Sequence, residues 1–397
     1  MVRVLSERLR SLTYEAKKNV TKLSAFMKSM VSVPAPHLQT LHLLVDPHDE
    51  SRIVDDRYLS GLGIFGADDD LTHLPILRSL RLHGICIPWT SNRYAKLSVL
   101  EVDTPEMRAP SQRRLLQQCP TLTYLRLCLP GLSAPVVSQD DPAWIISLPL
   151  LSKLKLEDMP PGDIRGLLSH LSLPSTTRYS IQTSADDDVP DRILPSNRSR
   201  LPGLMACDRV EFNCGDLGDS MTINCYRDHH ATGIDRPILT LRVDVVPATL
   251  TTMMSLLDIT YARTIVVCNL WDEDGAELEW ETLFASVCDL RTLRLVYPME
   301  RAAFVNALKV LAQPRDVSSD AGDVGMQRPL CVELTELELI GARCSDCMQD
   351  ALLQVCRWRK DEGVPLARLE LLEVNGMDPD VIRQLQELVA EVSVNEL

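Results

Sequence analysis

The sequence has few aromatic residues and no long apolar run. Phe, Trp and Tyr make up 5% of its 397 residues, so a core must be built from aliphatic side chains, which dominate the 45% hydrophobic content. A membrane-spanning helix needs about 18 or more consecutive apolar residues, and the chain has no such stretch. The first 30 residues also lack the apolar run of a secretory signal. We therefore expect a cytoplasmic or nuclear protein, with membrane association not favoured.

Sequence patterns of common catalytic sites are missing as well. There is no glycine-rich phosphate loop, no H-E-x-x-H and no G-x-S-x-G. We therefore expect no enzyme, no catalytic residue, no cofactor and no metal; a hydrolase with an unrecognised site is the alternative. Cys344 and Cys347 form the one C-x-x-C. Without a second ligand pair at suitable spacing, core or helix-cap cysteines are expected there rather than zinc ligands.

Acidic residues outnumber basic residues, 55 to 41, along the chain. The formal net charge is −14, which argues against nucleic acid as a partner. Residues 1–30 nevertheless carry seven Lys/Arg and two acidic residues, a balance of 7 − 2 = +5. We interpret 1–34 as a basic amphipathic helix that caps the core. A helix that binds membranes or a helical partner is the alternative.

A short leucine phrase recurs along the chain. At Leu122 the sequence reads L-T-Y-L-R-L, with leucines at positions 1, 4 and 6. The same spacing occurs at Leu38/Leu41/Leu43, Leu77/Leu80/Leu82, Leu97/Leu100/Val102, Leu151/Leu154/Leu156, Leu290/Leu293/Leu295, Leu334/Leu337/Leu339 and Leu366/Leu369/Leu371. Weaker versions occur at Cys207/Val210/Phe212, Ile238/Leu241/Val243, Thr176/Tyr179/Ile181 and Ala262/Ile265/Val267. Alternate side chains of a strand point the same way, so we expect positions 4 and 6 to face inward together.

This spacing is typical of leucine-rich repeats. It predicts an α/β leucine-rich-repeat solenoid, an irregular horseshoe, over 35–376 with long polar loops near 46–71, 183–203 and 313–329. Helices are expected on the convex side, among them 163–171, 301–312 and 346–359. A C-terminal capping helix is expected within 377–397, with Asp378 as its N-cap and Pro379 as its first helical residue.

Residues at positions 2, 3 and 5 of each phrase are expected on the concave strand face. They are basic for so acidic a chain, which predicts a protein partner that is acidic or phosphorylated. The residues assigned to partner binding are Arg78, Arg81, Tyr124, Arg126, Lys153, Lys155, Arg291 and Arg294. The polar residues Ser79, Thr123, Ser152 and Thr292 lie at the same positions.

The phrase C-P-T-L-T-Y-L-R-L-C, which begins at Cys119, resembles the cysteine-containing repeat of F-box/leucine-rich-repeat proteins. The stretch from Leu352 to Leu371 and the phrase from Leu74 to Gly84 are similar to repeats of the large fungal F-box families. The resemblance implies repeats that hold a substrate for ubiquitination and a possible Skp-type adaptor in a cullin complex. Residues 1–30 contain no L-P-x-E-type F-box. A free-standing recognition scaffold unrelated to ubiquitination is therefore the alternative.

Overall fold

The computed structural model divides the chain into two compact units, which we describe separately. Unit 1 comprises 1–184 and 193–205, and unit 2 comprises 185–192 and 206–397. The residues that the structure describes are 8–16, 35–45, 76–84, 94–104, 115–129, 145–184, 193–195, 197–204, 207–214, 220–227, 236–244, 259–268, 280–296, 301–315 and 328–395.

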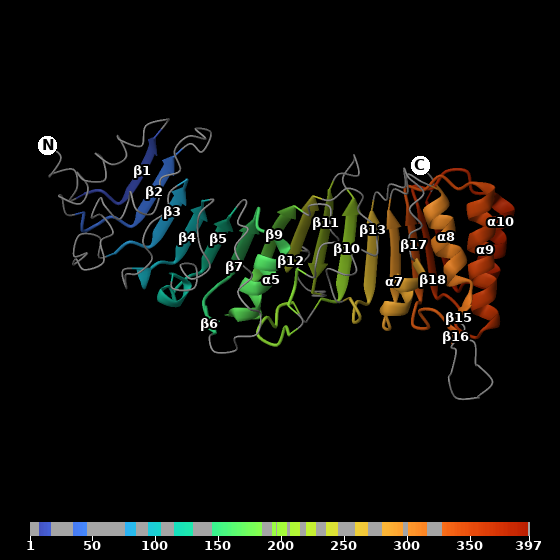
Figure 1. Cartoon of the computed structure of the whole chain (residues 1–397). Helices are drawn as coiled ribbons and strands as arrows, with labels where there is room; N and C mark the ends of the chain where they lie inside the picture. Colours follow the sequence, from blue (N-terminus) through green and yellow to red (C-terminus); the bar gives the residue numbers. More distant parts are fainter. Residues whose placement is uncertain are drawn as a thin grey trace, which may run out of the picture. The chain divides into compact units, whose positions relative to one another are not determined.

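Unit 1 contains seven parallel strands that follow one another in sequence order (Figure 1). They are β1 (Ser11–Ala16), β2 (Thr40–Val45), β3 (Ser79–His83), β4 (Val99–Asp103), β5 (Tyr124–Cys128), β7 (Lys153–Glu157) and β9 (Arg178–Ser184). Helix α5 (Pro161–His170) follows β7. The short strands β6 (Ile146–Ser147) and β8 (Leu171–Ser172) pair with each other in parallel.

Unit 2 contains eight strands in the order β12-β11-β10-β13-β14-β17-β18-β19. Their bounds are β10 (Arg209–Cys214), β11 (Met221–Tyr226), β12 (Leu239–Asp244), β13 (Thr264–Cys268), β14 (Thr292–Val296), β17 (Glu336–Ile340), β18 (Arg368–Leu372) and β19 (Glu391–Asn395). The helices are α7 (Trp280–Ser286), α8 (Arg301–Leu311), α9 (Asp346–Asp361) and α10 (Pro379–Leu388), and Figure 1 shows α8, α9 and α10 side by side. The short strands β15 (Pro314–Arg315) and β16 (Arg328–Pro329) pair antiparallel.

The leucine phrases form the core, two side chains from each strand. Leu80 and Leu82 of β3 are fully buried, while the residues between and beside them are half-buried or exposed. The weaker phrases behave alike, since Tyr179 and Ile181 of β9 are also buried. Burying one such side chain contributes roughly 1.5–3 kcal/mol. The prediction that positions 4 and 6 face inward is confirmed.

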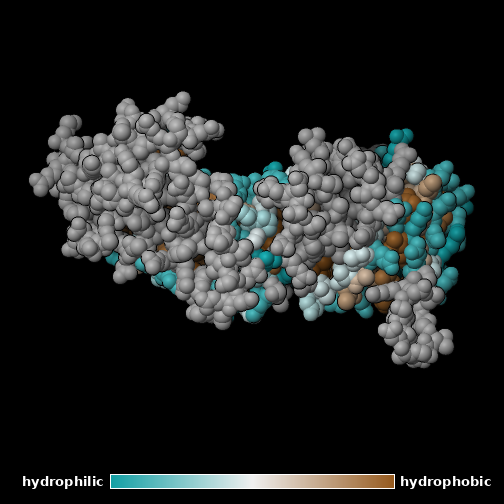
Figure 2. Space-filling view, viewed as in Figure 1, coloured by the Kyte–Doolittle hydropathy of each residue, from teal (hydrophilic) through white to brown (hydrophobic). Residues whose placement is uncertain are grey.

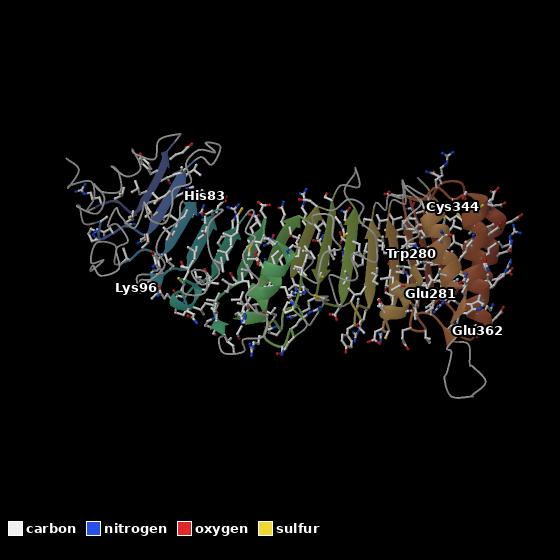
Figure 3. The ribbon with its side chains drawn as sticks, viewed as in Figure 1. His83, Lys96, Trp280, Glu281, Cys344 and Glu362 are labelled. Carbon is white, nitrogen blue, oxygen red and sulfur yellow. The ribbon has the colours of Figure 1, made fainter. Side chains whose placement is uncertain are left out.

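Aromatic packing supports the helices of unit 2. Trp280, at the start of the unpredicted helix α7 (Figure 3), is buried and its ring lies 5.5 Å from that of Phe284. Phe304 of α8 lies 6.4 Å from the same indole. Exposed positions on α9 and α10 are polar except for Cys347 and Pro379, and Figure 2 shows hydrophilic side chains over these helices. The polar outer surfaces and apolar inner surfaces explain why these helices pack on the core.

A hydrogen-bond ladder links the amino ends of the strands in unit 1. The carbonyl of Thr123 accepts the backbone N–H groups of Ser152 and Lys153 at 2.8 and 3.2 Å, and also the Ser152 hydroxyl at 2.8 Å. The carbonyl of Ser98 accepts from Thr123 and Tyr124 in the same way, with the Thr123 hydroxyl at 3.0 Å. This ladder fixes the register of neighbouring strands, and it occupies hydroxyls that the sequence assigned to a partner-facing surface.

The predicted fold class, a leucine-rich-repeat solenoid, is wrong. The structure is a mixed α/β arrangement. Its main strand sets, seven strands in unit 1 and eight in unit 2, are mostly parallel, and five helices lie within the described residues. In unit 2, β10, β11 and β12 form an antiparallel meander that reverses the strand order. Residues 215–220 connect β10 to β11, and they are too few for the crossover of about a dozen residues that a parallel pair requires.

The predicted N-terminal helix is also wrong where the structure describes it. Residues 11–16 form β1, which pairs in parallel with β2. Leu12 and Tyr14 alternate with Ser11, Thr13 and Glu15, a period of two that suits an edge strand. The rest of 1–34 lies outside the described residues.

The C-terminal segment combines a predicted helix with an unpredicted strand. Helix α10 begins as the sequence indicates, since the Asp378 side chain accepts the backbone N–H of Asp380 and Pro379 is in the first turn. The helix ends at Leu388, and residues 391–395 form β19 beside β18. Helix capping depends on residues that are close in sequence, whereas β19 depends on pairing with the edge of β18.

The three long loops are described only in part. The segment 46–71 lies outside the described residues. Within 183–203, Ile193, Leu194 and Leu201 are buried, so this segment contributes to the core of unit 1. Within 313–329, only 313–315 and 328–329 are described, and they include the paired strands β15 and β16.

Gly84 provides a test of the strand-exit geometry. Its φ is +66°, and a Cβ there would lie 2.6 Å from the carbonyl oxygen of Val45. We expect Gly84→Ala to lower the free energy of unfolding by at least about 1 kcal/mol, measured by urea denaturation. Gly166→Ala in α5 is the control, because no atom lies within 4 Å of its added Cβ. This substitution should raise the free energy of unfolding by about 0.5–1 kcal/mol. Equal stability of the two variants would contradict this account.

Arg359 provides a second test. It is fully buried in α9, and its guanidinium donates to the carbonyl oxygens of Leu330 and Leu334 at 3.3 and 2.8 Å, among others. Arg359→Leu would leave buried acceptors unsatisfied, at about 1–3 kcal/mol each. We expect a large drop in the thermal unfolding midpoint. Arg357→Leu, on the same helix with an exposed hydrogen bond to Gln384, should change it little.

Candidate partner-binding face

The side chains that alternate with the buried leucines of unit 1 form one surface, which we call the polar face. It consists of Ser79, Arg81 and His83 of β3, Val99, Glu101 and Asp103 of β4, Tyr124, Arg126 and Cys128 of β5, Lys153, Lys155 and Glu157 of β7, and Arg178, Ser180 and Gln182 of β9. The parallel register brings residues from distant repeats into rows, so 20 to 31 residues of sequence separate directly contacting side chains.

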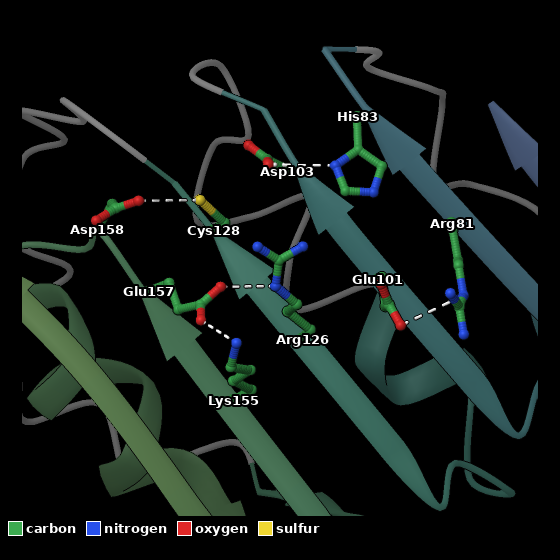
Figure 4. A network of polar contacts seen from close by, with 9 residues as sticks. All are labelled: Arg81, His83, Glu101, Asp103, Arg126, Cys128, Lys155, Glu157 and Asp158. Carbon is green, nitrogen blue, oxygen red and sulfur yellow. Dashed lines mark hydrogen bonds and ion pairs between the residues drawn. The ribbon is translucent and has the colours of Figure 1, made fainter. Parts of the chain in front are cut away.

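Three of the predicted binding residues form ion pairs on this face (Figure 4). The guanidinium Nε of Arg81 lies 3.3 Å from Glu101 on the next strand. Arg126 Nε donates to Glu157 at 2.6 Å, and Lys155 contacts the other oxygen of the same carboxylate. Two cations therefore share one anion between β5 and β7, and their positive charge is only partly neutralised.

The shared carboxylate is strongly influenced by its neighbours. Burial alone would raise the pKa of Glu157, but the hydrogen bonds from Lys155 and Arg126 outweigh it, so the pKa lies below its usual value. Burial opposes the charge of Arg126 too, and the hydrogen bond to Glu157 more than compensates, which raises the pKa of Arg126. The cluster is therefore charged at neutral pH and held in a fixed arrangement.

Lys153 and Arg178 lie directly beside each other on β7 and β9, and both are exposed. No carboxylate among the described residues forms an ion pair with either of them. The ammonium of Lys153 instead lies 5.6 Å from the centre of the Tyr124 ring. Like charges directly opposite in a sheet destabilise it, so this pair of cations is a feature that the fold itself does not require.

Arg78 lies immediately before β3 and is exposed. It forms no ion pair within the described part of unit 1, and its backbone carbonyl accepts the Ser98 hydroxyl at 3.2 Å. The structure thus places Arg78, Lys153 and Arg178 toward the amino ends of the strands, where the described face carries no acidic side chain at the neighbouring positions. Arg178 is a member of this set that the sequence analysis missed, because the phrase at Thr176 is degenerate.

The corresponding face of unit 2 is different. Arg294 is paired with the buried carboxylate of Glu338, and Thr292 donates its hydroxyl to Glu336 at 3.0 Å. Arg291 is exposed directly before β14. The hydrogen bond to Glu338 raises the pKa of Arg294, which shows how closely this cation is bound within the sheet. The predicted binding residues of unit 2 therefore offer less free positive charge.

At the carboxyl ends of the strands in unit 1, polar groups form a second row. His83 Nδ1 lies 3.3 Å from Asp103, and the Cys128 thiol donates to Asp158 at 3.3 Å. Burial and the nearby carboxylates Asp103 and Asp158 raise the pKa of Cys128. A nucleophilic cysteine requires a thiolate, so this arrangement suppresses the reactivity that catalysis would need.

The left-handed backbone of Asp158, at φ 54°, is a structural feature of the fold. Gly84, Gly341 and Glu373 follow β3, β17 and β18 in the same conformation. Strained residues are often found at functional sites, but here the conformation recurs wherever the chain leaves these strands. It therefore gives no evidence of catalysis at Asp158.

The two cysteines of the C-x-x-C lie in different environments. Cys344 is buried before α9 (Figure 3), and burial raises its pKa to about 11, while Cys347 is exposed. Within the described residues, no group of three or more His, Cys, Asp or Glu side chains could hold a metal ion. Across the same residues, no helix has the length and apolar character needed to cross a membrane.

Comparison with known proteins gives no further identification. No protein-family model matches this sequence, and no curated protein matches it either.

The Glu157 cluster predicts a specific pH dependence. Because the pKa of Glu157 is lower in the folded chain than its reference value of 4.5, the stabilisation is complete above that value and is lost as the pH falls through the folded pKa. We expect the free energy of unfolding of the native chain to fall below about pH 4.5. The Glu157→Gln variant should have a lower free energy of unfolding at neutral pH, and this value should fall less steeply as the pH is lowered. Urea denaturation across pH 3–7 measures this. Parallel pH profiles would contradict the assignment.

Proposed function

We propose that this chain is a non-enzymatic recognition protein whose polar face in unit 1 binds an acidic or phosphorylated segment of a protein partner. The observation that carries the proposal is the exposed pair Lys153 and Arg178, side by side without a carboxylate partner in the described structure. An anionic ligand would be attracted to both cations and would offset their mutual repulsion. Affinity would then come from a local feature that the fold does not need for its own stability.

The surroundings of this pair favour recognition over catalysis. Arg126 and Lys155 are fixed by Glu157 and add positive charge in the adjacent row. The one thiol on the described polar face, Cys128, is held protonated by burial and carboxylates. A protein segment is favoured over nucleic acid, because a chain of net charge −14 repels a polyanion over long distances.

The resemblance to F-box proteins suggests a narrower proposal. The stretch Cys119–Cys128, which carries the resemblance, forms the turn before β5 and β5 itself, and so supplies Tyr124 and Arg126 to the polar face. We propose on this basis a substrate receptor that works with a Skp-type adaptor and a cullin. A free-standing recognition scaffold is the second candidate, because Lys153 and Arg178 could bind a partner without an adaptor.

Affinity purification tests the proposal. We expect Lys153→Glu/Arg178→Glu to reduce the amount of recovered partner at least tenfold relative to the native chain, because the change reverses both charges. Lys309→Glu/Arg343→Glu, at exposed positions of unit 2, makes the same change in net charge and should retain the partner. Quantitative mass spectrometry of the eluates measures both.

Co-purification of a Skp-type adaptor and a cullin with the native chain would favour the ubiquitin-ligase receptor. Partners recovered without them would favour the free-standing scaffold. Equal recovery by the two charge-reversed variants would show that the polar face of unit 1 is not the binding surface.

A further inference from the structure

We infer that the anion held by Lys153 and Arg178 is the phosphate of a phosphorylated serine or threonine in the partner. This inference rests on the proposed function and specifies its ligand. The three strands involved, β5, β7 and β9, are neighbours within unit 1.

The spacing of the two cations suits a phosphate. Lys153 and Arg178 are paired positions on adjacent parallel strands, and such strands lie about 4.8 Å apart. A phosphorylated side chain carries about −1.5 to −2 charges and three acceptor oxygens, so it can contact both cations at once. A carboxylate carries one charge and would leave the second cation uncompensated. The planar guanidinium of Arg178 also suits bidentate binding of phosphate.

The neighbouring row strengthens the preference for a dianion. Arg126 and Lys155 lie beside each other on β5 and β7, two residues further along than Tyr124 and Lys153. They share the carboxylate of Glu157, which leaves an excess of one positive charge. Four cations and one acid therefore lie on three adjacent strands, and the excess over the whole patch is +3. This exceeds what a single acidic side chain can neutralise.

The residues that lead into the patch bring no competing acid. The residues just before these strands are Thr123, Ser152 and Thr177, all neutral, and their hydroxyls donate to backbone carbonyls. The ring of Tyr124 lies beside the Lys153 ammonium and limits where it can move. Its phenol is a hydrogen-bond donor at neutral pH, since the pKa of a tyrosine is ordinarily about 10 and burial raises the pKa of Tyr124 further.

Binding of degenerate peptide libraries tests the inference with the full chain. The probes are fluorescent libraries with a central phosphoserine, serine or glutamate flanked by four random residues on each side, and a single-stranded oligonucleotide. We expect the phosphoserine library to bind at least tenfold more tightly than the glutamate library. Lys153→Ala/Arg178→Ala should reduce that binding at least tenfold, and Lys309→Ala/Arg343→Ala should leave it unchanged.

The possible outcomes separate this inference from the proposed function. Equal binding of the phosphoserine and glutamate libraries, both weakened by Lys153→Ala/Arg178→Ala, would overturn the phosphate assignment and keep the acidic-segment proposal. Binding that ignores these substitutions would overturn both. Tighter binding of the oligonucleotide than of any peptide would also overturn both. Unfolding midpoints of the variants exclude misfolding, and Lys153→Arg, which keeps the charge, should retain the preference.

Discussion

The structure depends on burying two apolar side chains, on the same side of the backbone, from each strand that carries a leucine phrase. A strand alternates its side chains between two faces, so one face is committed to the core and the other is free to carry polar groups. Leu154 and Leu156 are fully buried while Lys153 and Lys155 between and beside them reach the other face. The leucine spacing thus explains the core and also defines which residues form the polar face.

Two local devices hold successive strands in this arrangement. At the amino ends, a single carbonyl such as that of Thr123 accepts two backbone N–H groups and a hydroxyl from the next strand. At the carboxyl ends, a left-handed residue turns the chain out of the sheet, as Gly84 does after β3 and Glu373 after β18. Because the turn is needed at both glycine and non-glycine positions, it is a requirement of the fold and not a mark of a catalytic site.

Charge on the polar face follows from pairing between strands. Arg81 meets Glu101, and Arg126 meets Glu157, which removes much of the positive charge that the sequence places there. Lys153 is different because its neighbours across the strands are Tyr124 and Arg178, neither of which is an acid. The candidate site is therefore distinguished by positive charge that no carboxylate neutralises at one position of the sheet, and not by the number of basic residues along the chain.

The sequence by itself determined the strands that carry a leucine phrase, the inward leucines and the start of α10, because alternation and helix capping involve residues only a few positions apart. It also placed Lys153, Lys155 and Arg126 on the polar face. Only the tertiary structure decided the antiparallel meander of β10–β12, the strand in place of an N-terminal helix, and the edge strand β19, since these depend on which neighbour each strand meets. It likewise decided that Glu157 neutralises Arg126 and that Arg178 stands beside Lys153. Those contacts join residues 25 and 31 positions apart, and no local pattern specifies them.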